Sequence, residues 1–132
     1  MFDILMYHFI LLSCHCLGDF PLQGEFLSEW KDKNFYCLLV HCMIYSFVMY
    51  LGCAYVMVHS GKMKTIDSES SCTIFLTFLI SHVIIDFCKC TARNLLAEEE
   101  KDGPKDIGMF HIDQMLHIAV IVSFLYYILI KG

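Results

Sequence analysis

Acidic and imidazole side chains recur inside apolar stretches of this chain, and three times they form a pair spaced four residues apart. The pairs are His15 and Asp19, His82 and Asp86, and Asp113 and His117. Side chains four residues apart on a helix lie on the same face. Imidazole nitrogens and carboxylate oxygens are metal ligands, and ionisable groups inside an apolar segment are costly. Each pair is therefore a candidate for binding or catalytic chemistry.

The order of the two residue types is reversed in the third pair. In a chain that crosses a membrane back and forth, the fourth helix runs opposite to the first and third. The reversal therefore brings every aspartate nearer to the same membrane surface and every histidine slightly deeper. His41, in the first third of the second apolar stretch, reaches a similar depth. The pattern predicts a single cluster near one face of the membrane.

An aspartate at the centre of a bilayer costs roughly 2.5–3.5 kcal/mol, so the cluster needs a compensating interaction. We expect one or two divalent metal ions, because a mixed imidazole and carboxylate set suits zinc best and also manganese or iron. Helix bundles build dinuclear sites from such ligand pairs. Hydrogen bonds between the histidines and aspartates, without a metal, are the alternative. The predicted metal ligands are His15, Asp19, His41, His82, Asp86, Asp113 and His117.

Further polar residues lie on the same helix faces as the pairs. Lys89 and Arg93 follow His82 by seven and eleven residues, toward the aqueous side. They are predicted to hold an anionic substrate, although positive charges at a membrane surface also serve as simple anchors. Gln114 precedes His117 by three residues and is assigned to substrate binding as well. The predicted catalytic carboxylates, one of them a general base, are Asp19, Asp86 and Asp113.

Four apolar segments must position these residues. With 58% hydrophobic residues, the chain exceeds the roughly 45–50% of an average soluble domain. The segments are long enough for membrane helices, although the first is short and Pro21 follows it. The sequence predicts an all-α integral membrane protein, one domain over residues 1–132, with four transmembrane helices in a bundle around the His/Asp cluster. The expected spans are about 4–20, 35–58, 72–90 and 107–130.

The distribution of charge predicts the orientation and excludes one class of partner. Nine basic residues in a chain of net charge −5 are too few and too scattered for nucleic-acid binding. Connections one and three hold six of the basic residues, which favours the cytoplasm for them. The termini are then expected outside the cytoplasm, in a protein of the cell (inner) membrane. The six residues are Lys31, Lys33, Lys89, Arg93, Lys101 and Lys105, against Lys62, Lys64 and Lys131 on the other side.

The eight cysteines and the N-terminus carry less information. Most of the cysteines fall in apolar segments, where cysteine behaves as a small hydrophobic residue, so we interpret them as packing residues. The N-terminus has Asp3 and no basic residue before the apolar run, which is untypical of a signal peptide. The first segment is therefore expected to remain as a membrane helix. The bilayer is the expected partner, and a thin bundle could also dimerise through its apolar outer faces.

The ordered set of motifs resembles a known family. The chain contains His15-Cys-Leu-Gly-Asp19-Phe-Pro-Leu-Gln23, then Trp30-Lys31, His41, His82-Val-Ile-Ile-Asp86-Phe-Cys-Lys89 and Asp113-Gln-Met-Leu-His117. It resembles the small bacterial and phage membrane proteins catalogued as domain of unknown function 3307. The resemblance covers nearly the whole chain and implies Gln23 as a further polar residue of the site, which we assign to substrate binding. The chain is also distantly similar to membrane-bound metal-dependent hydrolases.

Three functions remain open on the sequence. The first is a metal-dependent hydrolase that acts on a phosphoester or lipid-linked substrate at the cytoplasmic interface. The second is a non-catalytic membrane protein whose polar cluster specifies packing or binds a partner. The third is a proton or metal-ion transporter, which needs polar groups through the full membrane depth. The outer halves of the second and fourth segments offer few such groups.

Overall fold

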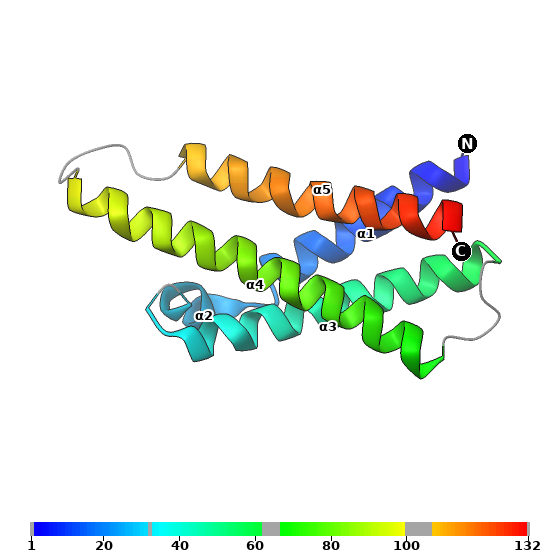
Figure 1. Cartoon of the computed structure of the whole chain (residues 1–132), viewed down its shortest axis with the longest axis horizontal. Coiled ribbons are helices and arrows are strands. Elements are labelled where there is room, and N and C mark those ends of the chain that lie inside the picture. Colours follow the sequence, from blue (N-terminus) through cyan, green and yellow to red (C-terminus); the bar gives the residue numbers. More distant parts are fainter. Residues whose placement is uncertain (1, 32, 62–66, 100–106, 132) are drawn as a thin grey trace.

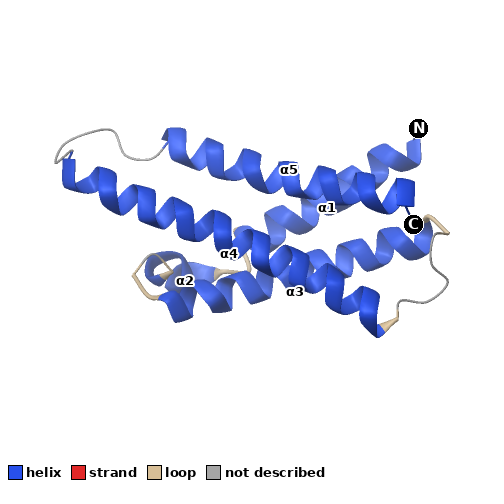
Figure 2. Cartoon of the chain, viewed as in Figure 1, coloured by secondary structure: helices blue, strands red, loops and turns tan. Residues whose placement is uncertain are grey.

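Helices are the regular secondary structure of the residues that the structure describes, joined by short turns. A computed structural model describes residues 2–31, 33–61, 67–99 and 107–131, with side chains for 3–31, 33–61, 67–92 and 109–130. These residues form five helices and no strand, so the all-α prediction is confirmed (Figure 2). The helices are α1 (Phe2–Asp19), α2 (Gly24–Trp30), α3 (Phe35–His59), α4 (Ser68–Glu99) and α5 (Ile107–Lys131).

Three helices are long and apolar enough to cross a membrane: α3, the Ser68–Ala92 part of α4, and the Met109–Ile130 part of α5. Helix α1 meets the same criterion only together with α2, across a bend of 76°. Length and composition therefore indicate a membrane protein with three spans, or four if the bent pair is one span.

The four long helices form a closed ring of neighbours. Helix α1 contacts α3 and α5, and α4 contacts the same two helices. Figure 1 shows that consecutive long helices run in opposite directions and that both termini lie at the same end of the bundle. The short helix α2 packs against α3 at the opposite end. Because of this alternation, the end of α1 and the beginning of α5 lie at the same depth in the bundle. The reversed order of the third pair, Asp113 and His117, fits this arrangement.

Two glycines allow α1 and α3 to approach closely. A Cβ atom on Gly52 would lie 2.8 Å from the Cys14 Sγ atom. A Cβ atom on Gly18 would lie 3.1 Å from Cδ2 and 3.3 Å from Cα of Tyr45. Larger residues at these positions would push the helices apart. The close contact lets side chains of α1 reach those of α3 in the bundle interior.

The bundle interior has an apolar half and a polar half. The apolar half includes Leu11, Met49, Phe78, Ile121 and Leu125, all fully or almost fully buried. The outer surface carries many exposed large hydrophobic side chains, as expected of helices that face lipid. The polar half holds the histidines and aspartates, so the interior is divided along the helix axes.

The segment between α1 and α3 contains a helix that the sequence did not predict. Helix α2 begins at Gly24, whose φ of +64° is in the left-handed region favoured by glycine. It spans only two turns, too few for a periodic apolar pattern to stand out. Its Phe26 and Trp30 rings stack at 6.1 Å and are 65% and 45% exposed. Such aromatic rings are typical of a membrane–water interface.

The third long helix also extends beyond its expected span at both ends. It begins at Ser68, where the Ser70 N–H donates a 2.9 Å hydrogen bond to Oδ1 of Asp67. It continues to Glu99, past the limit of about 90 expected from hydropathy. The additional turns are polar and contribute little to hydropathy, which explains why the apolar segment underestimates the helix.

Candidate metal centre

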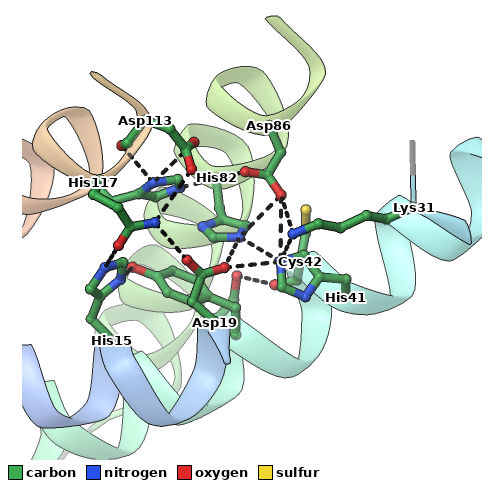
Figure 3. A network of polar contacts seen from close by, with 12 residues as sticks. His15, Asp19, Lys31, His41, Cys42, His82, Asp86, Asp113 and His117 are labelled. Carbon is green, nitrogen blue, oxygen red and sulfur yellow. Dashed lines mark hydrogen bonds and ion pairs between the residues drawn. The ribbon is translucent and has the colours of Figure 1, made fainter. Parts of the chain in front are cut away.

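All the histidines and aspartates of the three pairs, together with His41, meet in one buried network. Helices α1, α3, α4 and α5 each contribute to it, and Figure 3 shows the side chains converging between these helices. Each of these residues is at most 5% exposed. The structure thus brings together the residues that the sequence predicted to share one depth. They are His15, Asp19, His41, His82, Asp86, Asp113 and His117.

Two separate sets of three ligands lie side by side in the network. We call Asp19, His41 and His82 the first triad, and Asp86, Asp113 and His117 the second triad. In each triad, one ligand atom per residue lies within 4.8 Å of the other two. Each set is therefore compact enough to hold a metal ion. His82 connects the triads, since its ring centroid lies 4.3 Å from that of His117.

The first triad is held together around His41. The Nε2 atoms of His41 and His82 are 3.0 Å apart. The same His41 Nε2 atom lies 3.4 Å from Oδ1 of Asp19. It also lies 3.4 Å from Oδ2 of Asp86, which belongs to the second triad. His41 therefore contacts one carboxylate from each triad.

The second triad contains ligand atoms without hydrogen-bond partners. His117 Nδ1 lies 2.9 Å from the backbone oxygen of Asp113, which can only accept, so Nδ1 carries a proton. A neutral His117 then presents a lone pair on Nε2, 3.9 Å from Oδ1 of Asp86. Among the described residues, neither this Nε2 atom nor Oδ1 of Asp113 has a hydrogen-bond partner, although both are buried. A histidine fixed through its other nitrogen is typical of metal ligands.

His15 has a different environment from His117. Its Nε2 atom donates to Oε1 of Gln114 at 3.0 Å, and its Nδ1 atom accepts from the Tyr45 hydroxyl at 3.1 Å. Both ring nitrogens are therefore occupied, and His15 belongs to neither triad. The Gln114 amide also donates to Oδ2 of Asp19 at 3.0 Å. Gln114, predicted to bind substrate, thus lies between two predicted metal ligands and orients both.

Tyr45 packs against two histidines of the network, His82 and His15. Its ring stacks on His82 with a centroid distance of 3.8 Å and an interplanar angle of 19°. This contact fixes the plane of the His82 imidazole. Tyr45 therefore contributes both aromatic packing and a hydrogen bond, the latter from its hydroxyl to Nδ1 of His15.

Of the remaining predicted substrate-binding residues, Lys89 lies at the edge of the cluster. The Lys89 ammonium donates to Oδ2 of Asp113 at 2.7 Å, so it contacts a predicted metal ligand. Gln23 is half-buried, and its Oε1 atom is buried without a hydrogen-bond partner among the described residues. Arg93 lies on α4, but its side chain is outside the described residues.

Lys31 is a member of the network that the sequence interpretation missed. It appeared there only among the basic residues of the connections and in the Trp30-Lys31 motif. Its ammonium instead lies 3.4 Å from Oδ2 of Asp86 and 3.4 Å from Nε2 of His41. Because Lys31 directly follows α2, its approach depends on that unpredicted helix. The Trp30-Lys31 pair was already among the motifs of the family resemblance. This pair was the signal in the sequence that could have identified Lys31 as part of the site.

Cys42 is the second residue that was missed. Together with His82 and Asp86 it forms a third compact group of ligand atoms, within 4.8 Å of one another. Cys42 is fully buried. As the neighbour of His41 it points to a different part of the α3 surface, and only the packing of α4 brings His82 to it. No spacing in the sequence could have indicated this.

The fold and the buried cluster define a helical protein with three or four apolar candidate spans and groups that could hold a metal ion. The chain belongs to the family described as "Protein of unknown function (DUF3307)", whose model matches residues 7–131. This match confirms the resemblance seen in the motifs. No curated protein and no solved structure matches the chain.

Proposed function

We propose that this protein is a membrane-embedded, metal-dependent hydrolase that acts on a phosphoester or lipid-linked anionic substrate. The second triad is the proposed metal site. The observation that carries this proposal is the pair of buried, unpartnered ligand atoms, Oδ1 of Asp113 and Nε2 of His117. A buried polar atom without a partner costs roughly 1–3 kcal/mol, and a bound cation would remove that cost.

The composition of the second triad suits a catalytic metal site. Two carboxylates and one imidazole supply three protein ligands, and catalytic zinc sites commonly have three. The remaining coordination positions are then free for water and substrate. Zinc fits this set best, and manganese or iron are the alternatives. When bound, such an ion activates a water molecule and polarises the scissile group.

Asp19 is the proposed general base. It lies outside the second triad, yet it shares the His41 Nε2 atom with Asp86, and each carboxylate is 3.4 Å from that atom. The Gln114 amide orients its other oxygen. Asp19 can therefore accept a proton beside the metal without serving as a ligand.

An apolar groove between α4 and α5 favours a lipid-linked substrate. The groove has a volume of about 610 Å³, and its lining includes Ser81, Ile84, Leu116 and Phe124. The same two helices carry all three residues of the second triad. A hydrocarbon chain in the groove would thus bring its anionic head to the polar half of the bundle. The positive charges of connections one and three favour the cytoplasmic side for this end.

A structural role for the cluster is the second candidate. Most of its groups already have partners within the chain, including the contact of Lys89 with Asp113 and that of Gln114 with Asp19. Satisfied buried networks of this kind can specify a unique helix packing. A transporter is disfavoured, because the apolar half described above fills the rest of the interior among the described residues.

Metal analysis of the purified protein tests the proposal. The protein, purified in detergent and dialysed against zinc, is expected to retain a divalent ion by mass spectrometry of the digested sample. Asp113→Ala and His117→Ala should each lose it, because a three-ligand site with two ligands binds weakly. His111→Ala, an exposed residue on the same helix, is the matched control and should retain the ion.

The structural alternative predicts a different result. Wild-type protein would then contain no ion, and its thermal stability would be unaffected by a chelator. That outcome would contradict the proposed metal site.

A further inference from the structure

Positive charges of the chain lie against both triads, but they meet them differently: Lys31 contacts a ligand nitrogen of the first triad, whereas the lysines contact the second triad through Oδ2 of Asp86 and Oδ2 of Asp113. Nε2 of His41 is 3.0 Å from the imidazole of His82 and 3.4 Å from the carboxylate of Asp19. The ammonium of Lys31 lies 3.4 Å from this same nitrogen. Figure 3 shows the Lys31 side chain extending to the gap between His41 and Asp86. The ammonium thus contacts a ligand atom of the triad itself.

The second lysine of the network has a different position relative to its triad. Lys89 contacts Oδ2 of Asp113 at 2.7 Å, while Oδ1 of that carboxylate has no hydrogen-bond partner among the described residues. Lys31 contacts Oδ2 of Asp86, while Oδ1 of that residue is the oxygen nearer to His117. Both lysines therefore leave the oxygens that face the second triad accessible to a cation, and only Lys31 contacts the first triad.

The balance of charge also favours one metal ion instead of two. With neutral imidazoles, the carboxylates of Asp19, Asp86 and Asp113 face the ammonium groups of Lys31 and Lys89, which leaves one negative charge. One divalent ion reverses this to one positive charge, which a hydroxide or an anionic substrate can neutralise. A second divalent ion would add two more positive charges to a buried site, where uncompensated charge is costly.

Helix α2 holds Lys31 in this position. Its exposed Phe26 and Trp30 rings are suited to the membrane surface, and Lys31 follows directly at the end of the helix. The Lys31 side chain is only 12% exposed, so it enters the bundle rather than the solvent. A lysine that served only as a surface anchor would keep its ammonium in water.

We propose that the Lys31 ammonium takes the place of a second metal ion, so that a chain with ligands for two cations binds one. This inference rests on the proposed metal site in the second triad. It assigns the first triad and Lys31 to a site in which a fixed positive charge, instead of a metal, neutralises Asp19 and Asp86. Lys31 is then a positioning residue that sets the metal stoichiometry of the centre.

Metal stoichiometry in a lysine variant tests the inference. Lys31→Met removes the charge and keeps an unbranched side chain of similar length. Dialysed against zinc and, separately, manganese, the wild-type protein should bind one ion per chain and Lys31→Met two. Lys33→Met, which changes an exposed lysine two residues away, should bind one. The double variant Lys31→Met with His41→Ala should return to one, because it lacks a ligand of the first triad.

The outcomes separate the inference from the proposed function. One ion per chain in Lys31→Met, or two in the wild type, would overturn the inference and leave the metal site intact. No ion in the wild type would overturn the proposed function. If Lys31→Met does not fold, His41→Ala with Lys31 present gives the answer. It should retain one ion, and loss of that ion would show that the first triad holds the metal.

Discussion

At the scale of single residues, the hydrogen bonds of each histidine distinguish roles that the residue type alone does not. His15 uses both ring nitrogens, one toward Gln114 and one toward Tyr45. His117 uses only Nδ1, toward a backbone carbonyl, and keeps Nε2 free of hydrogen-bond partners within the described chain. Each of the two residues lies four positions from an aspartate in the sequence. Only the second has the geometry of a metal ligand.

Asp19 gives a prediction at this scale. In Asp19→Asn, we expect hydrolysis of a chromogenic phosphodiester to fall by about 10²–10⁴-fold, the usual contribution of a general base. Metal content should stay at the wild-type value, because Asp19 is outside the second triad. Steady-state rates over a range of pH, with metal analysis of the same sample, provide the measurement.

Cys16→Ser is the control for this variant, since Cys16 is exposed on the same helix. It should leave both rate and metal content unchanged. Loss of metal in Asp19→Asn would instead place the ion in the first triad.

At the scale of elements, the contact between α1 and α3 determines whether the polar network can form. Gly18 lies against both the ring and the backbone of Tyr45. Tyr45 in turn contacts His15 and stacks on His82. A small residue in one helix thus positions an aromatic ring that orients two histidines. This dependence connects helix packing directly to the geometry of the cluster.

Gly18→Val should therefore destabilise the protein by about 1–3 kcal/mol, the typical cost of overpacking a close contact. The backbone of Tyr45 cannot move without shifting α3, so the strain cannot be relieved by one side chain. Unfolding in a denaturing detergent titration measures the loss. Leu17→Val changes the neighbouring exposed residue and should cost much less. Equal losses in both variants would argue that the contact with Tyr45 is unimportant.

At the scale of the whole molecule, the division of the interior into two halves places the candidate metal centre at one end of the bundle. Both termini lie at the end opposite α2 (Figure 1). The polar half therefore faces the side of connections one and three, where the basic residues are concentrated. The groove between α4 and α5 carries apolar and hydroxyl side chains along the same helices. This arrangement would give the anionic head and the hydrocarbon chain of the proposed lipid-linked substrate separate environments.

Reporter fusions test the orientation that this arrangement implies. Alkaline phosphatase is active only outside the cytoplasm, so fusions to either terminus should be active. A fusion inserted at residues 100–106 should be inactive, because the third connection is expected in the cytoplasm. A green fluorescent protein series should give the reciprocal pattern. Activity of the phosphatase at the third connection would reverse the proposed orientation.

The sequence by itself determined the four long helices and the common depth of the cluster, because both follow from local periodicity. Apolar segments long enough to span a membrane must be helical, since the backbone has to satisfy its own hydrogen bonds. A spacing of four residues places His82 and Asp86 on one face whatever surrounds them. The reversed order of Asp113 and His117 then follows from the alternating direction of the helices.

Only the tertiary structure decided how the ligands divide into two triads and which other residues join them. Which atoms meet across helices depends on helix rotation, close approach at Gly18 and side-chain rotamers, none of which leaves a periodic signal. Lys31 enters the cluster because α2 bends away from α1 by 76°. Cys42 joins a ligand group because α4 packs against α3. Contacts between distant segments are set by packing, and local spacing does not encode them.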